Sequence, residues 1–151
     1  MRVVLQRVGR ASVTVDGVVV SSIGRGFLIL VGIENGDSAE DVAVAADKIA
    51  GLRVFPDEVG KMNLSIGDVS GEVLVVSQFT LLGDVKRGRR PSFTAASPPE
   101  VAAPLLDQMV ATLSRMGIPT ATGVFGASMS VESVNEGPVT LLFSVTNSRL
   151  D

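Results

Sequence analysis

The chain lacks four residue types altogether: its 151 residues include no histidine, cysteine, tryptophan or tyrosine. Without histidine and cysteine there can be no Ser-His-Asp triad, no thiol nucleophile, no imidazole base and no Cys/His zinc site. No disulfide can form, so the composition does not indicate secretion. An enzyme of this composition has to rely on carboxylates, lysine, hydroxyl groups, backbone dipoles or groups that its substrate supplies.

Aromatic residues and long apolar runs are also scarce. The only aromatic residue is phenylalanine, so we expect a core built mainly from Val, Ile, Leu and Ala. No apolar run is long enough to cross a bilayer, and the first residues lack the pattern of a signal peptide. The net charge of −3 does not favour a surface coated in phosphate-binding groups. We therefore expect one cytoplasmic domain over residues 1–151, with no metal and no cofactor.

Strand and helix signals alternate along the chain and predict an α/β fold. Asp16-Gly17 between two apolar stretches predicts a two-residue hairpin turn. The continuously apolar segments at 26–33 and 72–80 predict buried strands. Further strands are expected at 3–8, 11–15, 18–20, 53–55, 120–125, 129–134 and 138–146.

Two segments have the spacing of amphipathic helices. Residues 38–50 follow a predicted capping box of Asp37 and Glu40, and Gly51 should end that helix. The second helix should start with Ser97 as its cap and stop at Gly117. Its predicted buried stripe consists of Val101, Leu105, Met109, Val110, Leu113 and Met116.

Polar side chains interrupt the apolar strand that ends with Ser77-Gln78-Phe79-Thr80. Ser77 or Thr80 could be a nucleophile, although no histidine is present to activate it. Alternatively, the backbone N–H groups of residues 78–80 could bind a developing oxyanion. The hydroxyl groups could also simply cap a turn, which leaves three interpretations open.

Three further features allow both a structural and a functional interpretation. Gly137-Pro138 could be a turn between strands, or a rigid steric gate if its peptide bond is cis. Phe125, flanked by glycines, could belong to the core or line a pocket. Arg7 could point to solvent, or hold a carbonyl oxygen with its guanidinium.

The one dense cationic cluster is Lys86-Arg87-Gly88-Arg89-Arg90, which Phe93 follows shortly afterwards. Such a run is often only a solvated loop. In an acidic chain, however, a local cluster of this density could also bind phosphates, because Lys and Arg neutralise nucleic acid backbones without reading sequence.

Taken together, the segments resemble the D-aminoacyl-tRNA deacylases, the editing enzymes that remove D-amino acids from tRNA. The two hallmark motifs of that family are Ser-Gln-Phe-Thr, found here at 77–80, and Asn-X-Gly-Pro-Val-Thr, found here at 135–140. The first eight residues, the segment at 90–93 and the segment at 123–127 also look like the family. The resemblance implies a single compact α/β domain with mixed β-sheets in barrel-like α/β/β layers and two helices.

The resemblance also implies a chiral filter between two subunits. By this resemblance the chain would form a homodimer. Its Gly137-Pro138 dipeptide, joined by a cis bond, would enter the pocket of the partner subunit. Its carbonyl groups would exclude an L side chain, and Arg7 would hold the dipeptide in orientation. Glycine would pass the same filter, so glycyl-tRNA is an expected second substrate.

For catalysis, the resemblance implies that the terminal adenosine of the tRNA binds near Ser77, Gln78 and the segment from Phe125 through Ala127 to Met129. The backbone N–H of Phe79 would serve the oxyanion, and Thr80 would help to position the ester. The 2′-hydroxyl of the adenosine would assist hydrolysis. Lys86, Arg87, Arg89 and Arg90 would contact tRNA phosphates.

One departure from the family pattern is Ser128, which stands where many members carry Asp.

Two other functions stay open alongside the deacylase. One is a small-ester hydrolase that uses Ser77, Thr80 or Ser92 with a lysine base. The other is a non-enzymatic module that binds RNA through residues 86–90.

Overall fold

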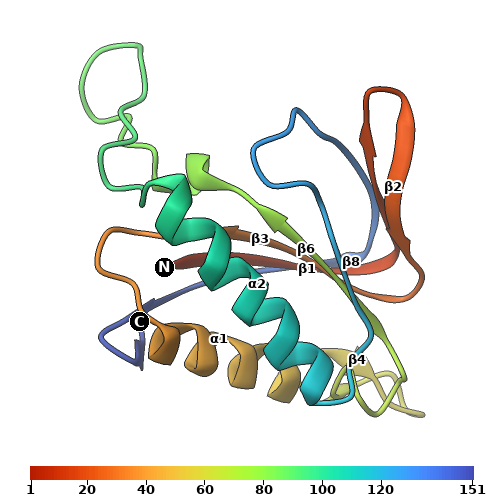
Figure 1. Ribbon diagram of the computed structural model, residues 1–151. Helices are drawn as coiled ribbons and strands as arrows, with labels where there is room; N and C mark the ends of the chain where they lie inside the picture. The colour runs from red at the N-terminus through yellow and green to blue at the C-terminus, as the bar shows by residue number, and fades with distance from the viewer.

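A curled, mixed β-sheet carries both helices on one of its faces, as Figure 1 shows for the computed structural model, which describes residues 1–151. The helices are α1 (Ala39–Gly51) and α2 (Pro99–Arg115), and a 3₁₀ helix, η1, spans Phe79–Leu82. The strands are β1 (Arg2–Val15), β2 (Val18–Ile23), β3 (Gly26–Gly32), β4 (Phe55–Pro56), β5 (Met62–Leu64), β6 (Glu72–Ser77), β7 (Thr120–Thr122), β8 (Ser130–Thr146) and β9 (Arg149–Leu150).

The sheet has the order β7-β6-β3-β1-β8-β9, with β2 paired to β1. Strands β3, β6 and β7 run parallel, and the remaining pairs are antiparallel. One half of β1 pairs with β3 and the other half with β2, while β8 follows β1 almost throughout. This change of partner curls the sheet, which confirms the expected barrel-like arrangement of layers with two helices.

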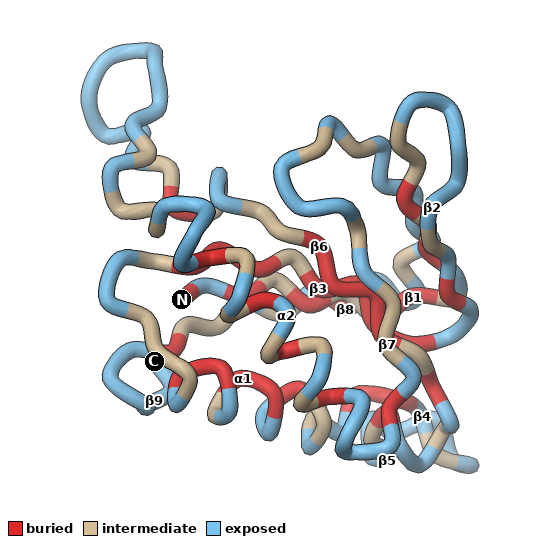
Figure 2. Tube along the Cα trace, viewed as in Figure 1, coloured by how far each residue is buried: buried red, intermediate tan, exposed pale blue.

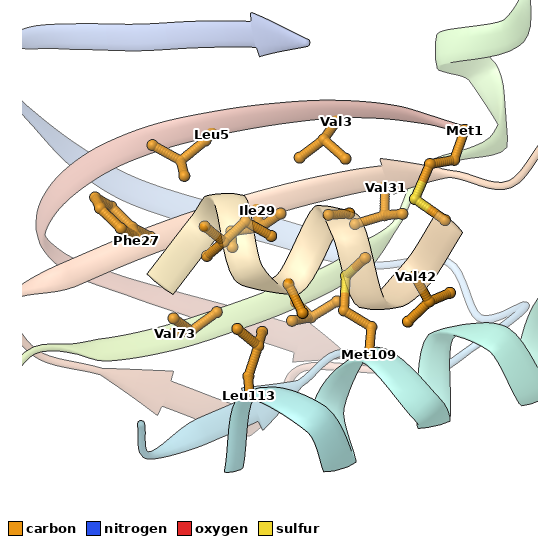
Figure 3. Close-up of a cluster of buried hydrophobic side chains, with 14 of the residues drawn as sticks. Met1, Val3, Leu5, Phe27, Ile29, Val31, Val42, Val73, Met109 and Leu113 are labelled. Atoms are coloured by element: carbon orange, nitrogen blue, oxygen red, sulfur yellow. The ribbon is translucent and has the colours of Figure 1, made fainter. Parts of the chain in front are cut away.

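Most of the core lies between the sheet and the two helices. Figure 3 shows side chains from β1 and β3 pointing toward those of the helices, among them Leu5, Ile29, Val42 and Met109. A smaller cluster occupies the other face, under the β2 hairpin. The buried parts of the chain run along the central strands and along one side of α1 (Figure 2). No helix of the structure is both long and apolar enough to span a membrane.

Strand predictions were correct in type but often wrong in extent. The turn at Asp16-Gly17 is confirmed, and both residues have positive φ. The predicted strands 3–8 and 11–15 are one strand, because the ladder with β8 continues past the change of partner. Likewise, 129–134 and 138–146 form the single strand β8. Strand β6 ends at Ser77, and η1 replaces the rest of the predicted segment.

The short elements between α1 and β6 were less well predicted. The strand expected at 53–55 is β4, which lies at Phe55–Pro56. It pairs with β5, which falls within a stretch expected to be only a polar connection. In the last third of the chain, β7 is shorter than the strand predicted at 120–125.

Both helices are confirmed, but their caps and the buried face of α2 differ from prediction. Ser97 donates its hydroxyl to the Glu34 carbonyl (2.8 Å) and does not cap α2; Pro98 takes the N-cap position. The buried residues of α2 are Ala102, Leu106, Met109 and Leu113, whereas Val101 and Met116 are exposed. Apolar residues lie next to each other along this helix, so that two neighbouring faces are about equally apolar. The spacing alone could not predict which face is buried.

The capping box of α1 is formed by Ser38 and Asp41, one residue later than expected. Asp37 instead accepts hydrogen bonds from the amino group of Met1 and from Glu34 N–H, both at 2.6 Å. Asp41 is only 3% exposed and also accepts a hydrogen bond from Ser148 N–H at 2.7 Å. It therefore ties the start of α1 to the turn between β8 and β9.

We expect Asp41→Asn to destabilise the fold at neutral pH by about 1–3 kcal/mol, the cost of leaving buried donors without their charged acceptor. Burial raises the pKa of Asp41, but the hydrogen bonds from Ser148 and Ser38 outweigh it and hold the pKa below the usual 3.8. A carboxyl of this kind stabilises the protein above its unfolded pKa and loses that contribution as the pH falls through the folded value.

The free energy of unfolding should therefore differ between Asp41→Asn and wild type at pH 7, and the difference should shrink below about pH 4. Urea denaturation across this pH range measures the effect. Asp47→Asn, an exposed change on the same helix, is the matched control. A constant difference at every pH would contradict a role for the ionised carboxylate.

Candidate functional site

A mostly apolar cavity of about 570 Å³ lies between the end of β6, the start of α2 and the segment before β8. The residues that line it include Ser77, Gln78, Phe79, Phe125, Ala127 and Met129. The structure thus brings together six predicted site residues from two segments, 77–79 and 125–129, that are about fifty positions apart. Their meeting follows from the sheet, because β6 and β7 run parallel and their carboxyl ends lie at one edge.

The floor of the cavity is the point at which β6 gives way to η1. Gln78 N–H still donates to the Val31 carbonyl (2.7 Å), which fixes the strand end. Phe79 and Thr80 open η1, where the first N–H groups of a helix have no acceptor within it. Thr80 does not line the cavity; its hydroxyl accepts a hydrogen bond from the Gln78 side-chain amide. The backbone N–H groups of Phe79 and Thr80 therefore have no acceptor within η1, and Phe79 lines the cavity.

Phenylalanine side chains form much of the rim. Phe79 is 54% exposed and packs edge-on against Phe93, with ring centroids 5.1 Å apart. Phe125 is 41% exposed on the opposite segment. Half-exposed aromatic rings around an apolar cavity are suited to contact with a flat ring of a ligand.

Sequence reasoning did not identify the wall that precedes and begins α2. Phe93, Ala96, Ser97, Pro99 and Ala102 all line the cavity. The one available signal was Phe93, an apolar residue within a polar, basic loop. Ala96, Ser97 and Ala102 gave no such signal in the sequence, because they line the cavity only as a result of where α2 packs.

The basic cluster lies on a projecting loop. Lys86, Arg87, Arg89 and Arg90 are all exposed, and Figure 1 shows the loop reaching away from the sheet at the upper left. Two hydrogen bonds between the backbones of Asp84 and Ser92 (2.7 and 2.9 Å) close its base. Because Phe93 follows directly, the loop is attached to the rim of the cavity.

Gly137 and Pro138 form a bulge within β8, so their interpretation as a turn between two strands is wrong. Their peptide bond is cis, and both residues are exposed. Gln6 of β1 pairs with Thr140, and Val8 pairs with Asn135. Two positions along β1 are therefore matched by five positions along β8. The additional residues therefore protrude from the sheet.

Arg7 holds the bulge from β1. Its Nε donates to the Glu136 carbonyl at 3.1 Å, and its Nη1 donates to the Val54 carbonyl at 2.5 Å. A Cβ placed on Gly137 would lie 2.9 Å from Arg7 Nη2, and the φ of Gly137 is +127°. Of the two readings of Arg7, the structure therefore favours the one in which it holds a carbonyl.

The bulge and the cavity are separate within one chain. Neither Gly137, Pro138 nor Arg7 lines the cavity. Within the cavity, the groups suited to chemistry are backbone N–H groups and hydroxyls. No group of three or more acidic residues gathers anywhere in the chain to hold a metal ion.

Comparison with known proteins agrees with this geometry. The family model for D-Tyr-tRNA(Tyr) deacylase matches residues 4–144. The chain belongs to that family. A D-aminoacyl-tRNA deacylase of Chloroflexus aurantiacus is 59% identical over 99% of this chain and 94% of its own length. One from Geobacter sulfurreducens is 53% identical over 99% of this chain and 97% of its own.

Two solved structures have the same fold as this member of the deacylase family. A structure titled "c-Myc DNA Unwinding Element Binding Protein" is 42% identical, with a TM-score of 0.91 over 97% of this chain and 99% of that one. A probable eukaryotic D-amino acid tRNA deacylase shares the fold at 21% identity, with a TM-score of 0.82. The resemblance to the deacylases is thus confirmed, and the chain is an enzyme of a family of ester hydrolases that act on D-aminoacyl-tRNA.

Proposed function

We propose that the chain proofreads chirality by rejecting L-aminoacyl-tRNA at a gate formed by Gly137 and Pro138. D-aminoacyl-tRNA and glycyl-tRNA would pass this gate and be hydrolysed to free tRNA and amino acid. The observation that carries the proposal is the exposed bulge on β8, held by Arg7 and separate from the cavity of its own chain. A protruding element of this kind is suited to filling a pocket on another molecule.

In this proposal the 570 Å³ cavity receives the terminal adenosine of the tRNA. Its base would contact the aromatic rim near Phe125, with Met129 and Ala127 beneath it. The backbone N–H of Phe79 would stabilise the oxyanion that forms as the ester carbonyl is attacked. Gln78 would hold Thr80 in place, and Thr80 would position the ester.

The nucleophile in this mechanism is a water molecule that the 2′-hydroxyl of the adenosine helps to activate. The cavity holds no lysine or carboxylate that could act as a base for Ser77. Catalysis would then consist of orientation and oxyanion stabilisation, two effects that do not require a nucleophilic side chain. This favours the proposal over a Ser/Thr-dependent esterase.

The gate can act only if a second copy of the chain supplies it, so the proposal includes a homodimer. Strand β8 supports it, because most of its residues are exposed and only Val145 and Thr146 pair with a strand, β9, on the edge away from β1. Leu142 is 71% exposed and pairs with Val4 on the face away from the helices. An uncovered apolar position of this kind fits a self-complementary interface.

We expect Leu142→Asp to raise the dissociation constant of the dimer at least 100-fold, because a symmetric interface would bury the new charge twice. Deacylation should fall with the fraction of dimer. Sedimentation velocity over a range of concentrations, combined with activity at the same concentrations, measures both. Val59→Asp, at a residue 76% exposed in a distant turn, is the control. A monomeric wild type with full activity would contradict the shared site.

The exposed Lys86–Arg90 loop would contact phosphates of the tRNA next to the cavity, since its cations can neutralise a backbone without reading its sequence. A module that only binds RNA would need this loop but not the cavity. Release of glycine and of D-amino acids from charged tRNA tests the enzymatic proposal: both should be released. Binding of tRNA without release of either would favour the RNA-binding alternative.

A further inference from the structure

The base of the β8 bulge is closed by one side chain, that of Asn135. Its Oδ1 accepts a hydrogen bond from Val139 N–H at 2.8 Å, and its Nδ2 donates to Thr140 Oγ1, also at 2.8 Å. Asn135 therefore connects the residue at which the chain leaves the ladder with the two residues at which it returns. The bulge between them becomes a closed loop with Gly137 and Pro138 at its tip.

The other contacts of the bulge restrain it from different directions. Arg7 holds the Glu136 carbonyl from β1, and the Val139 side chain is buried in the main core. Gln6 Nε2 lies 3.4 Å from Thr140 Oγ1 and adds a weaker contact. These groups and the ladder with β1 hold the bulge to the rest of the sheet, whereas the Asn135 side chain ties the two ends of the bulge to each other.

Neither Asn135 nor Thr140 lines the cavity. An effect of either residue on the reaction would have to pass through the tip of the bulge. The two hydrogen bonds of Asn135, which clamp the base of the bulge, restrict its position more narrowly than packing alone, because one uses the side chain as a donor and the other as an acceptor.

We infer that Asn135 is a positioning residue that sets the depth to which Gly137 and Pro138 reach into the substrate pocket, and thereby the discrimination between D- and L-aminoacyl-tRNA. The inference rests on the proposed gate. A bulge with its base unclamped would present the same atoms at a variable depth. An L side chain would then be excluded less often, while the cavity and its N–H donors would be unchanged.

Two pairs of substitutions separate the clamp from its surroundings. Asn135→Leu has nearly the same size but loses both hydrogen bonds. Asn135→Asp keeps an acceptor for Val139 N–H, and its second oxygen can accept the hydroxyl proton of Thr140. Thr140→Val removes one partner, whereas Thr140→Ser keeps the hydroxyl. Thr146→Val, at an exposed position on the same strand, is the control.

The experiment measures initial rates on D-tyrosyl-tRNA and L-tyrosyl-tRNA for each full-length variant, together with its unfolding midpoint. The ratio of the two rates does not depend on how much of the enzyme is folded. Asn135→Leu should lower this ratio about tenfold, mainly by raising hydrolysis of the L substrate, which corresponds to the loss of two neutral hydrogen bonds. Asn135→Asp, Thr140→Ser and Thr146→Val should keep the ratio within about twofold.

If Asn135→Leu does not fold, Thr140→Val decides, with an expected fall in the ratio of about threefold for one lost hydrogen bond. Lower rates on both substrates at an unchanged ratio would overturn the inference, because Asn135 would then serve stability alone. Wild type without any preference for the D substrate would instead refute the gate itself. The two failures are therefore distinguishable.

Discussion

Replacing Gly137 by alanine is expected to lower deacylation about 10- to 100-fold, on glycyl-tRNA as well as on D-aminoacyl-tRNA. Two effects combine. The φ of +127° is strained for any L side chain. The added Cβ would also lie 2.9 Å from both Arg7 Nη2 and Val139 Cγ2, so that the bulge or its support has to move. Glycine has no side chain that the gate could exclude. A loss of activity on glycyl-tRNA would therefore indicate that the gate itself has moved.

The matched control for this substitution is Gly60→Ala. Gly60 also has a positive φ, +80°, but a Cβ there would meet nothing within 4 Å, in a turn remote from the cavity. It should therefore reduce stability slightly and leave the rate unchanged. Single-turnover deacylation at saturating enzyme measures the chemical step. Full activity of Gly137→Ala on both substrates would mean that Gly137 and Pro138 are only a structural bulge.

A D-aminoacyl-tRNA that ends in 2′-deoxyadenosine should be hydrolysed at least about 100-fold more slowly than the normal substrate, which is the usual contribution of one proton-transfer group in the transition state. The proposal assigns this task to the substrate, because the chain has no histidine and the cavity is lined by neither lysine nor carboxylate. Binding should change little, since the lost hydroxyl is a small part of the contact.

Ser77→Ala and Thr80→Ala provide the comparison. Each should retain activity within about tenfold of wild type, because neither hydroxyl is proposed to attack the ester. Competition by the deoxy substrate against the normal one separates binding from turnover. Undiminished hydrolysis of the deoxy substrate, or complete loss in one alanine variant, would favour a hydroxyl nucleophile of the protein.

The sequence predicted those parts of the fold that short-range patterns encode. The turn at Asp16-Gly17 and the helix after Ser38 depend on local conformational preferences and on spacing, and both were found. The continuity of β8 through Gly137 could not be predicted, because a Gly-Pro pair usually interrupts a strand. It depends instead on the ladder with β1 and on the contact with Arg7, which are distant in sequence.

The same limit applies to the site. The motif at 77–80 was recognisable because polar residues end an apolar strand. Ala96 and Ala102 line the same cavity without any pattern in their neighbourhood. They became part of the site only because α2 packs beside the end of β6, which long-range contacts decide. Asn135 and Thr140 belong to the motif at 135–140, but the hydrogen bonds of the Asn135 side chain could not be predicted, since they depend on a bulge in β8.

The most direct test of chiral proofreading compares the release of D-tyrosine and L-tyrosine from charged tRNA by the purified protein under the same conditions. Rejection at the gate predicts rapid release of D-tyrosine and release of L-tyrosine no faster than spontaneous hydrolysis. Equal rates for the two enantiomers, or no release of D-tyrosine, would contradict it.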